Sequence, residues 1–256
     1  MLLGAALVLA GCGKSNLVTN TATVGSAPAP APAPARTATT AKAPAPRAST
    51  VPVPLPLTAA RAAAFAKAVE LTGADVPGAH PARRSKTPLA REREAAQCGG
   101  RTAGAVGGGR SPEFQRGGAL ERESLSSGVE VLRDEKSVER DLAYAQTPRG
   151  LRCYERVLSR SLRAEADPHI KIFDVRVAPL SVTVAGAGAA RGIRILAHVG
   201  VPGAGVVVRL FVDAVSLPYG PAEINLYGTS FVQPIAERTE QELLTLLRER
   251  ARRQKL

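Results

Sequence analysis

Four strand-like segments in the second half of the chain constrain its fold most strongly. They span residues 170–177, 192–201, 205–215 and 222–230, and in each of them apolar side chains alternate with polar ones. Alternation with a period of two is typical of a strand that buries one face. The connecting segments are short and rich in glycine, as at 202–205. The pattern predicts an antiparallel meander with one apolar face and one more polar face.

Segments with helical periodicity or capping residues surround this meander. The predicted helices span residues 57–71, 87–98, 134–146, 148–166 and 235–253. Thr58, Thr87 and Asp134 stand where N-cap residues are expected. A further strand is predicted within 119–133, whereas the glycine-rich stretch 104–114 is predicted to be a mobile loop. We therefore expect an α+β fold, in which helices pack on one face of an antiparallel sheet of about five strands.

A proline-rich stretch separates the predicted domain from the amino terminus. Residues 27–35 read APAPAPAPA, and similar repeats continue to Pro56. Alternating prolines favour an extended, solvated chain over packed structure. The sequence thus predicts a signal peptide at 1–11, a modified cysteine with a disordered Pro/Ala/Thr tether at 12–56, and an α+β envelope domain at 57–256.

The segment LVLAGCGKS, from Leu7 to Ser15, combines two motifs that exclude each other. A phosphate-binding loop ending in GKS requires a glycine at position 8, which is Val8, and a helix in place of the proline-rich stretch. The apolar run from residue 2 to residue 11 instead has the small residues that end a signal peptide. As a helix it is about 15 Å long, too short to span a bilayer core of roughly 30 Å.

The four residues LAGC resemble the lipobox of bacterial lipoproteins. In that family the cysteine becomes the new amino terminus and carries lipid, so the resemblance implies that Cys12 anchors the protein on the extracytoplasmic face of the cell membrane. The alternative is a chance apolar segment on a cytoplasmic protein, because no Lys or Arg precedes the run as it does in most signal peptides.

The two remaining cysteines, Cys98 and Cys153, form an even pair in a chain that we expect outside the cytoplasm, where disulfides persist. We therefore predict a disulfide between them, with two free buried thiols as the alternative. Neither cysteine belongs to a CxxC motif, and the histidines show no zinc-site spacing. We expect neither a metal site nor a cofactor.

The net charge of +12 favours anionic partners. The first 56 residues hold four basic side chains and no acidic one, which leaves 30 basic and 22 acidic side chains, a net charge of +8, in the rest. Nucleic acid is not expected as a partner, because the chain has no Trp and its nine Phe and Tyr residues are not interleaved with basic ones.

A candidate ligand site lies on the polar side of the predicted meander. Arg176, Arg194 and Arg209 fall on that side of neighbouring strands, and His198 and Tyr227 are in the same phase. Their guanidinium groups would hold a phosphate or carboxylate through forked hydrogen bonds. The alternative is that these arginines solvate one side of the sheet and pair with Asp174 and Asp213.

No catalytic constellation is recognisable in the sequence. A G-x-S-x-G motif is absent, and none of His80, His169 and His198 has a nearby partner that would make it a general base. We therefore do not expect an enzyme. The alternative, a hydrolase, would require His198 to lie within hydrogen-bond reach of a carboxylate and a hydroxyl.

The order of these features is similar to that of extracytoplasmic lipoproteins of actinobacteria. The resemblance lies in the lipobox, the tether, the two cysteines, SPEF, SSGVEVLRDEKSVERDLA, RCYERVL and the final ERTEQELLTLLRERA. The same features loosely resemble the extracellular sensor domains of actinobacterial receptor kinases. The resemblance implies a small envelope domain that binds a ligand and has no defined chemistry. We expect a lipid-anchored, non-catalytic module that binds an apolar or anionic small ligand or senses for an envelope partner. The alternative is a structural or partner-binding lipoprotein without a ligand pocket.

Overall fold

The computed structural model describes residues 56–82, 98, 105–118, 121–165, 170–201 and 205–256. The predicted signal peptide at 1–11 and nearly all of the tether at 12–56 lie outside the described residues. So does the helix predicted at 87–98, apart from its last residue.

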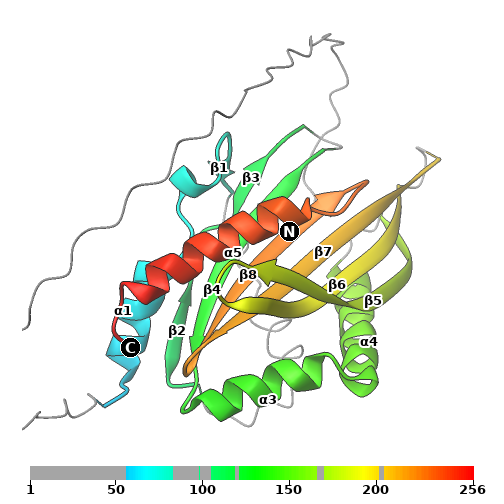
Figure 1. Ribbon diagram of the computed structural model, residues 1–256. Coiled ribbons are helices and arrows are strands. Elements are labelled where there is room, and N and C mark those ends of the chain that lie inside the picture. The colour runs from blue at the N-terminus through cyan, green and yellow to red at the C-terminus, as the bar shows by residue number, and fades with distance from the viewer. Residues whose placement is uncertain (1–55, 83–97, 99–104, 119–120, 166–169, 202–204) are drawn as a thin grey trace, which may run out of the picture. The chain divides into compact units, whose positions relative to one another are not determined.

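A single antiparallel sheet of eight strands organises the described part of the chain (Figure 1). Its strands are β1 (His80–Pro81), β2 (Gly107–Arg110), β3 (Phe114–Arg116), β4 (Glu123–Val131), β5 (Lys171–Val184), β6 (Gly188–Val201), β7 (Val206–Tyr219) and β8 (Ala222–Phe231). They follow the order β1-β3-β4-β8-β7-β6-β5, and β2 pairs with β4 as well. The predicted α+β class and the predicted meander, β5 to β8, are confirmed.

The prediction of about five strands was too low, because three short strands precede β4. The glycine-rich stretch predicted as a loop contains β2, which pairs with β4 through Gly107 to Arg110. A Cβ on Gly107 or Gly109 would stand 3.0 Å from the Cβ of Ala62 or Ala66, respectively, in helix α1 (Ala59–Val69). These glycines therefore allow a helix to pack closely on a strand, a role that strand propensity does not reveal.

Four α-helices are described, α1, α3 (Glu135–Ala145), α4 (Pro148–Glu165) and α5 (Glu237–Arg252), each where the sequence predicted one. Two of the predicted N-caps are confirmed. The Thr58 side chain accepts a hydrogen bond from the Arg61 backbone N–H, and the Asp134 side chain accepts one from that of Ser137. Each cap satisfies an amide that the first turn of the helix leaves without a partner.

Helices cover both faces of the sheet, not one face as predicted. Val215 and Leu217 of β7 pack in the core that contains α1 and α5, whereas Val212 and Ala214 pack in a second cluster with Leu158 of α4. Because successive side chains of a strand point to opposite faces, α4 lies on the face opposite to α5 (Figure 1). We call the two sides the α5 face and the α4 face.

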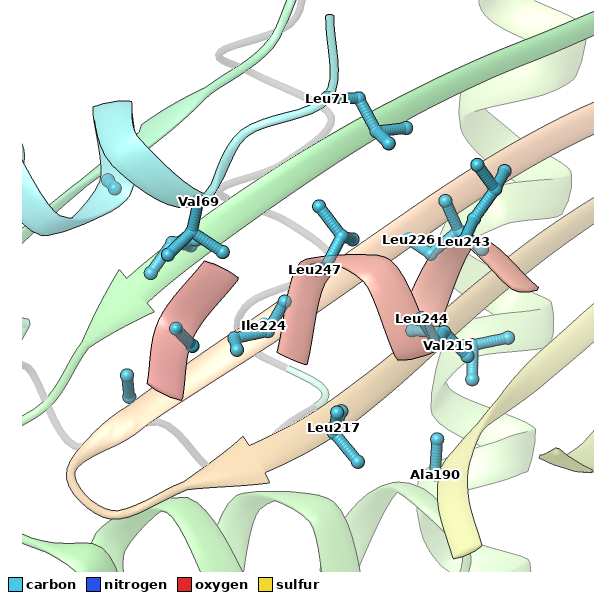
Figure 2. Packing of buried hydrophobic residues seen from close by; sticks show 14 of the residues in the cluster. Val69, Leu71, Ala190, Val215, Leu217, Ile224, Leu226, Leu243, Leu244 and Leu247 are labelled. Carbon is cyan, nitrogen blue, oxygen red and sulfur yellow. The ribbon is translucent and has the colours of Figure 1, made fainter. Parts of the chain in front are cut away.

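The larger core lies between α5 and the middle of the sheet (Figure 2). Leu243, Leu244 and Leu247 of α5 are buried, as the helical periodicity predicts, and they meet Ile224 and Leu226 of β8. Burying a leucine or isoleucine side chain contributes about 1.5–3 kcal/mol. This packing fixes the position of α5 and therefore of the groups at its amino end.

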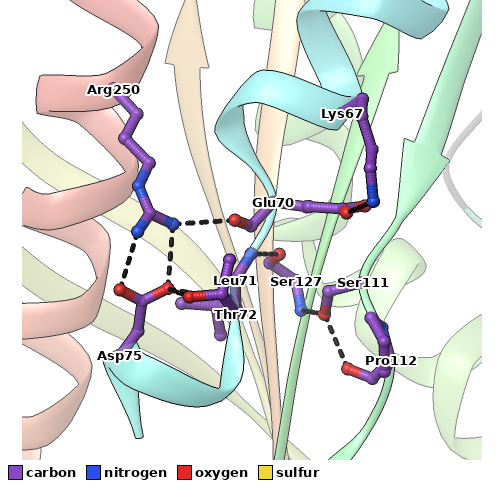
Figure 3. A network of polar contacts seen from close by, with 9 residues as sticks. All are labelled: Lys67, Glu70, Leu71, Thr72, Asp75, Ser111, Pro112, Ser127 and Arg250. Carbon is purple, nitrogen blue, oxygen red and sulfur yellow. Dashed lines mark hydrogen bonds and ion pairs between the residues drawn. The ribbon is translucent and has the colours of Figure 1, made fainter.

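A polar network joins the carboxyl end of α5 to the turn after α1 (Figure 3). Arg250 donates to both carboxylate oxygens of Asp75 at 2.9 and 2.7 Å and to the backbone oxygen of Glu70 at 2.7 Å. The Leu71 backbone N–H donates to the hydroxyl of Ser127 in β4 at 2.7 Å. These bonds tie α1, α5 and the sheet together by directional contacts.

We expect Asp75→Asn to lower the free energy of unfolding at pH 7 by about 2 kcal/mol, since it removes the charge that Arg250 binds with two hydrogen bonds. Burial raises the pKa of Asp75, but the hydrogen bonds from Arg250 and Thr72 outweigh it and hold the pKa below its usual value. The stabilisation is therefore present at neutral pH and lost as the pH falls through that lowered pKa. Urea titrations at pH 7 and pH 3 measure the difference, which should shrink at pH 3.

Glu249→Gln provides the matched control for Asp75→Asn. Glu249 lies on the surface of α5, next to Arg250 in the sequence, and pairs with Arg252 at 3.3 Å. This exposed pair should contribute less than about 1 kcal/mol. Equal stability of the two variants at pH 7 would contradict the importance of the Arg250–Asp75 pair.

Cys98 and Cys153 form a disulfide, with a Cα–Cα distance of 5.5 Å and a sequence separation of 55 residues. Cys153 lies in α4, and Cys98 is fully buried. The bridge therefore connects the α4 side of the domain to a segment that is distant in the sequence.

Candidate functional site

A cavity of about 430 Å³ opens at the amino end of α5. Its wall includes Glu123 of β4, Arg194 of β6, the loop 233–236, and Glu237 and Glu240 of α5, together with part of β5. The volume falls in the range of small-molecule sites. Three of the lining side chains are carboxyl groups, so the wall is more acidic than a protein of net charge +12 would suggest.

Arg194 is held in the wall by a two-pronged ion pair with Asp213. Its Nε donates to Oδ1 at 2.7 Å and its Nη2 donates to Oδ2 at 2.9 Å. The two residues lie directly opposite each other in β6 and β7, so the strand register creates the pair. Asp213 is only 2% exposed. Its negative charge is therefore stabilised by Arg194 rather than by water.

Glu240 is buried next to this pair and carries an atom without a partner. The residue is 2% exposed, and its Oε2 accepts no hydrogen bond within the described part of the chain. Burial and the neighbouring Asp213 raise the pKa of Glu240 to about 8, although the charge of Arg194 acts in the opposite direction. Glu240 is thus mainly protonated at neutral pH, and the three groups then carry no net charge.

The loop between β8 and α5 contains a strained residue beside the cavity. Val232 has a φ of 71°, a conformation that β-branched residues rarely adopt. Its backbone N–H donates to the Arg209 oxygen at 2.9 Å, and the Ser230 hydroxyl donates to the Gln233 oxygen at 2.8 Å. Such strain costs about 1–3 kcal/mol and gathers at functional sites. Here the positive φ of Val232 turns the chain from β8 into the loop that lines the cavity.

The structure places four of the five residues predicted as one ligand site on the same face of the sheet, spread along it, and the fifth on the opposite face. Arg194 lines the cavity, but Arg176, His198 and Arg209 lie nearer the end of β6 and the start of β7, on the same face. Tyr227 lies on the α4 face, since it is opposite Ala214, and the guanidinium of Arg110 stands 4.6 Å from its ring centre.

The alternative interpretation was that these arginines pair with aspartates. The structure contains two such pairs. Arg194 binds Asp213, and Arg176 lies 3.3 Å from Asp174, which also contacts His198 at 2.5 Å. The side chains of Arg176 and Asp174 are largely open to solvent, so that pair contributes little to stability.

The acidic side of the cavity was not predicted from the sequence. Glu240 stands three, four and seven residues before Leu243, Leu244 and Leu247, on the apolar stripe of the helix. A glutamate on such a stripe must be buried, which is the signal that could have identified it. Glu123 and Glu237 carry no comparable signal.

The hydrolase alternative depends on the surroundings of His198. His198 contacts the Asp174 carboxylate, but the hydrogen bonds among described residues bring no hydroxyl group to its ring. Among those residues, no group of three or more His, Cys, Asp or Glu side chains is arranged to hold a metal ion.

Comparisons with known proteins define no family for this chain, because no protein-family model and no curated protein matches it. Among solved structures, the extracellular domain of PknH from Mycobacterium tuberculosis matches with a TM-score of 0.43 and 9% identity, over 77% of this chain and 98% of that domain. This neighbour is an extracellular domain, as are the sensor domains that the sequence resembles. At this identity and TM-score, no functional property passes from that domain to this chain.

In the described segments, no helix is both long and apolar enough to cross a membrane.

Proposed function

We propose that the protein is a lipid-anchored extracytoplasmic module that binds a small ligand, without catalysis, in the cavity at the amino end of α5. The observation that carries this proposal is the buried carboxyl of Glu240, whose Oε2 has no partner among the described residues. A buried polar atom without a hydrogen bond costs about 1–3 kcal/mol. A ligand that donates a hydrogen bond near this carboxyl would recover that cost.

The chemistry of the wall indicates what kind of ligand fits. Carboxyl groups of Glu123, Glu237 and Glu240 surround the cavity, and Arg194 is already bound to Asp213 on both prongs. Glu240 is mainly protonated and Glu123 pairs with Arg116 at 2.8 Å, so Glu237 supplies the negative charge of the wall, and an anion would meet that charge without a lining arginine left to bind it. The wall favours a small polar molecule with hydrogen-bond donors over the anionic ligand predicted from the arginines.

Three features support an extracytoplasmic location and a lipid at Cys12. The LAGC motif follows an apolar run, a proline-rich stretch follows the motif, and the folded part contains the Cys98–Cys153 disulfide. Disulfides of this kind persist in oxidising compartments.

The anchor can be tested by changing Cys12 to Ala in the native host. We expect a larger precursor that lacks lipid and leaves the membrane fraction on washing, and globomycin should produce the same precursor from the wild-type chain. An unchanged position on the gel and unchanged fractionation would contradict the anchor.

Ligand binding can be tested by native mass spectrometry of protein purified from its host. We expect the wild-type protein to retain a small molecule, and Leu180→Trp to lose it, because Leu180 of β5 lines the cavity on the α5 face, beside Val182, and an indole would occupy the space. Thr183→Trp is the matched control, since Thr183 is exposed on the same strand and does not line the cavity. Empty spectra for the wild-type protein in repeated preparations would favour the structural or partner-binding alternative.

A further inference from the structure

A second surface lies on the α5 face, at the end of the sheet where β6 ends and β7 begins. It combines two exposed apolar side chains, Phe173 and Val207, with three basic ones, Lys171, Arg176 and Arg209, and we call these five residues the hairpin surface. Phe173 is 55% exposed and Val207 is 56% exposed. No helix covers them, although large apolar side chains elsewhere in the described residues are mostly buried.

The strand register places the apolar members next to one another. Lys171 of β5 and Val207 of β7 both lie opposite Gly200 of β6. A Cβ on Gly200 would stand only 2.6 Å from the Phe173 ring. The ring thus lies over Gly200, between the two neighbouring strands, and on the same face as Lys171 and Val207.

The basic members extend this surface along the strands. Arg209 lies opposite His198, two residues from Gly200, and its guanidinium stands 5.7 Å from the ring centre of Phe211. Arg176 lies opposite Leu196, two residues further along the same strand. Residues two apart in a strand share a face, so both arginines lie on the face of Phe173 and Val207.

One acidic side chain reduces the positive charge of this surface. The Asp174 carboxylate contacts His198 at 2.5 Å and Arg176 at 3.3 Å. With His198 neutral, Lys171, Arg176, Arg209 and Asp174 leave a formal charge of +2 beside the apolar pair.

We propose that the hairpin surface docks on a bilayer of anionic lipid, with Phe173 and Val207 entering the interface and the basic side chains contacting lipid phosphates. Exposed apolar and aromatic side chains surrounded by basic ones match the two attractions that such a membrane offers. An anionic polymer would use only the basic residues, and an apolar protein partner would not need them. Membrane contact uses both groups, and the lipid at Cys12 proposed above would keep this surface near the bilayer.

The proposal is tested by vesicle sedimentation with the full chain carrying Cys12→Ala, which removes the anchor from the measurement. We expect binding to vesicles made of equal parts phosphatidylglycerol and phosphatidylcholine, weak binding to pure phosphatidylcholine, and loss of binding at high salt. Arg209→Gln should weaken binding about fivefold, the effect of one basic residue near an anionic surface. Arg238→Gln, an exposed arginine of α5, should not change it.

Two neighbouring valines provide a charge-matched control for the apolar contact. Val206 and Val207 are similarly exposed, at 52% and 56%, but point to opposite faces of β7. Each is changed to Asp, so both variants gain the same charge at almost the same place. We expect Val207→Asp to lose binding at least tenfold more than Val206→Asp, with thermal unfolding confirming that both variants fold.

Three results would overturn this docking mode. Equal binding to both vesicle types would remove the role of the lipid charge, and equal effects of the two valine changes would remove the role of the α5 face. Phe173→Ser without effect, together with a strong Arg209→Gln effect, would point to an anionic polymer instead of a bilayer. Because the chain in this assay carries no lipid, failure here is distinct from failure of the anchor, which the Cys12→Ala fractionation measures.

Discussion

The stability advantage of Glu240→Gln over the wild-type protein should grow by about 1.4 kcal/mol per pH unit as the pH rises from about 4.5 to about 8. The Glu240 pKa is raised to about 8 in the folded protein from an ordinary value of 4.5. Within that window the unfolded chain has already released the proton that the folded protein keeps. The wild type therefore loses stability as the pH rises, and the loss stops above about pH 8.

Glutamine is the suitable replacement because it has nearly the same shape as glutamic acid but does not titrate. A hydrogen bond with Asp213 is one of the causes of the raised Glu240 pKa, and the glutamine amide can donate the same bond, so the variant should fold and should match the wild type near pH 4.5. At pH 8 the accumulated difference should reach about 4 kcal/mol in favour of the variant. Urea titrations at several pH values from 4.5 to 9 measure it directly.

The control for this experiment is Glu242→Gln on the same helix. Glu242 is exposed and pairs with Arg238 at 2.7 Å, so its change should shift stability by less than about 1 kcal/mol across the window. Parallel pH profiles for the wild type and Glu240→Gln would show that the Glu240 carboxyl is not held in a buried, protonated state. Ligand binding in the cavity would then no longer be supported by a buried, unpartnered carboxyl group at Glu240.

The α+β fold was predictable because its signals are local. The caps of Thr58 and Asp134 and the alternation along β5 to β8 depend only on residues close in the sequence. The coverage of both sheet faces by helices was not predictable, because alternation shows which side chains share a face and not which helix covers that face. That choice is made by packing between segments far apart in the chain.

The bulge in β5 shows why part of the surface chemistry was also missed. The sequence places Phe173 in phase with Val175 and Val177 on one apolar face. The pairing with β6 shifts between Ile172 and Val175, which moves the ring of Phe173 to the α5 face over Gly200. One extra residue in a strand reverses the face of the side chains beyond it. Alternation alone does not reveal such a shift.

The candidate site, like the fold, was only partly predictable from the sequence. The Arg194–Asp213 pair requires the register of β6 against β7, so the sequence offers several partners for Arg194 and the fold selects one. The burial of Glu240 was accessible in principle, because a glutamate in phase with Leu243, Leu244 and Leu247 has no place on the solvent side of the helix.

Breaking the disulfide should cost the domain about 4 kcal/mol of unfolding free energy. The bridge closes a loop of 55 residues, and the loss of chain entropy that this imposes on the unfolded state gives that value. We expect Cys153→Ser and reduced wild-type protein to unfold at the same, much lower urea concentration. Oxidised wild-type protein should yield a disulfide-linked peptide containing both cysteines after proteolysis without reductant.

Urea unfolding of the oxidised and reduced wild-type protein also tests whether the protein belongs in an oxidising compartment, because these two forms differ only in the Cys98–Cys153 bridge. A Cys98→Ala, Cys153→Ala double variant controls for reactive thiols and should match the reduced wild type whether or not reductant is present. If reductant leaves the wild-type midpoint unchanged, the bridge does not hold the domain together. If reductant lowers it as expected, the folded protein depends on an oxidising environment, which a chain released into the cytoplasm does not meet.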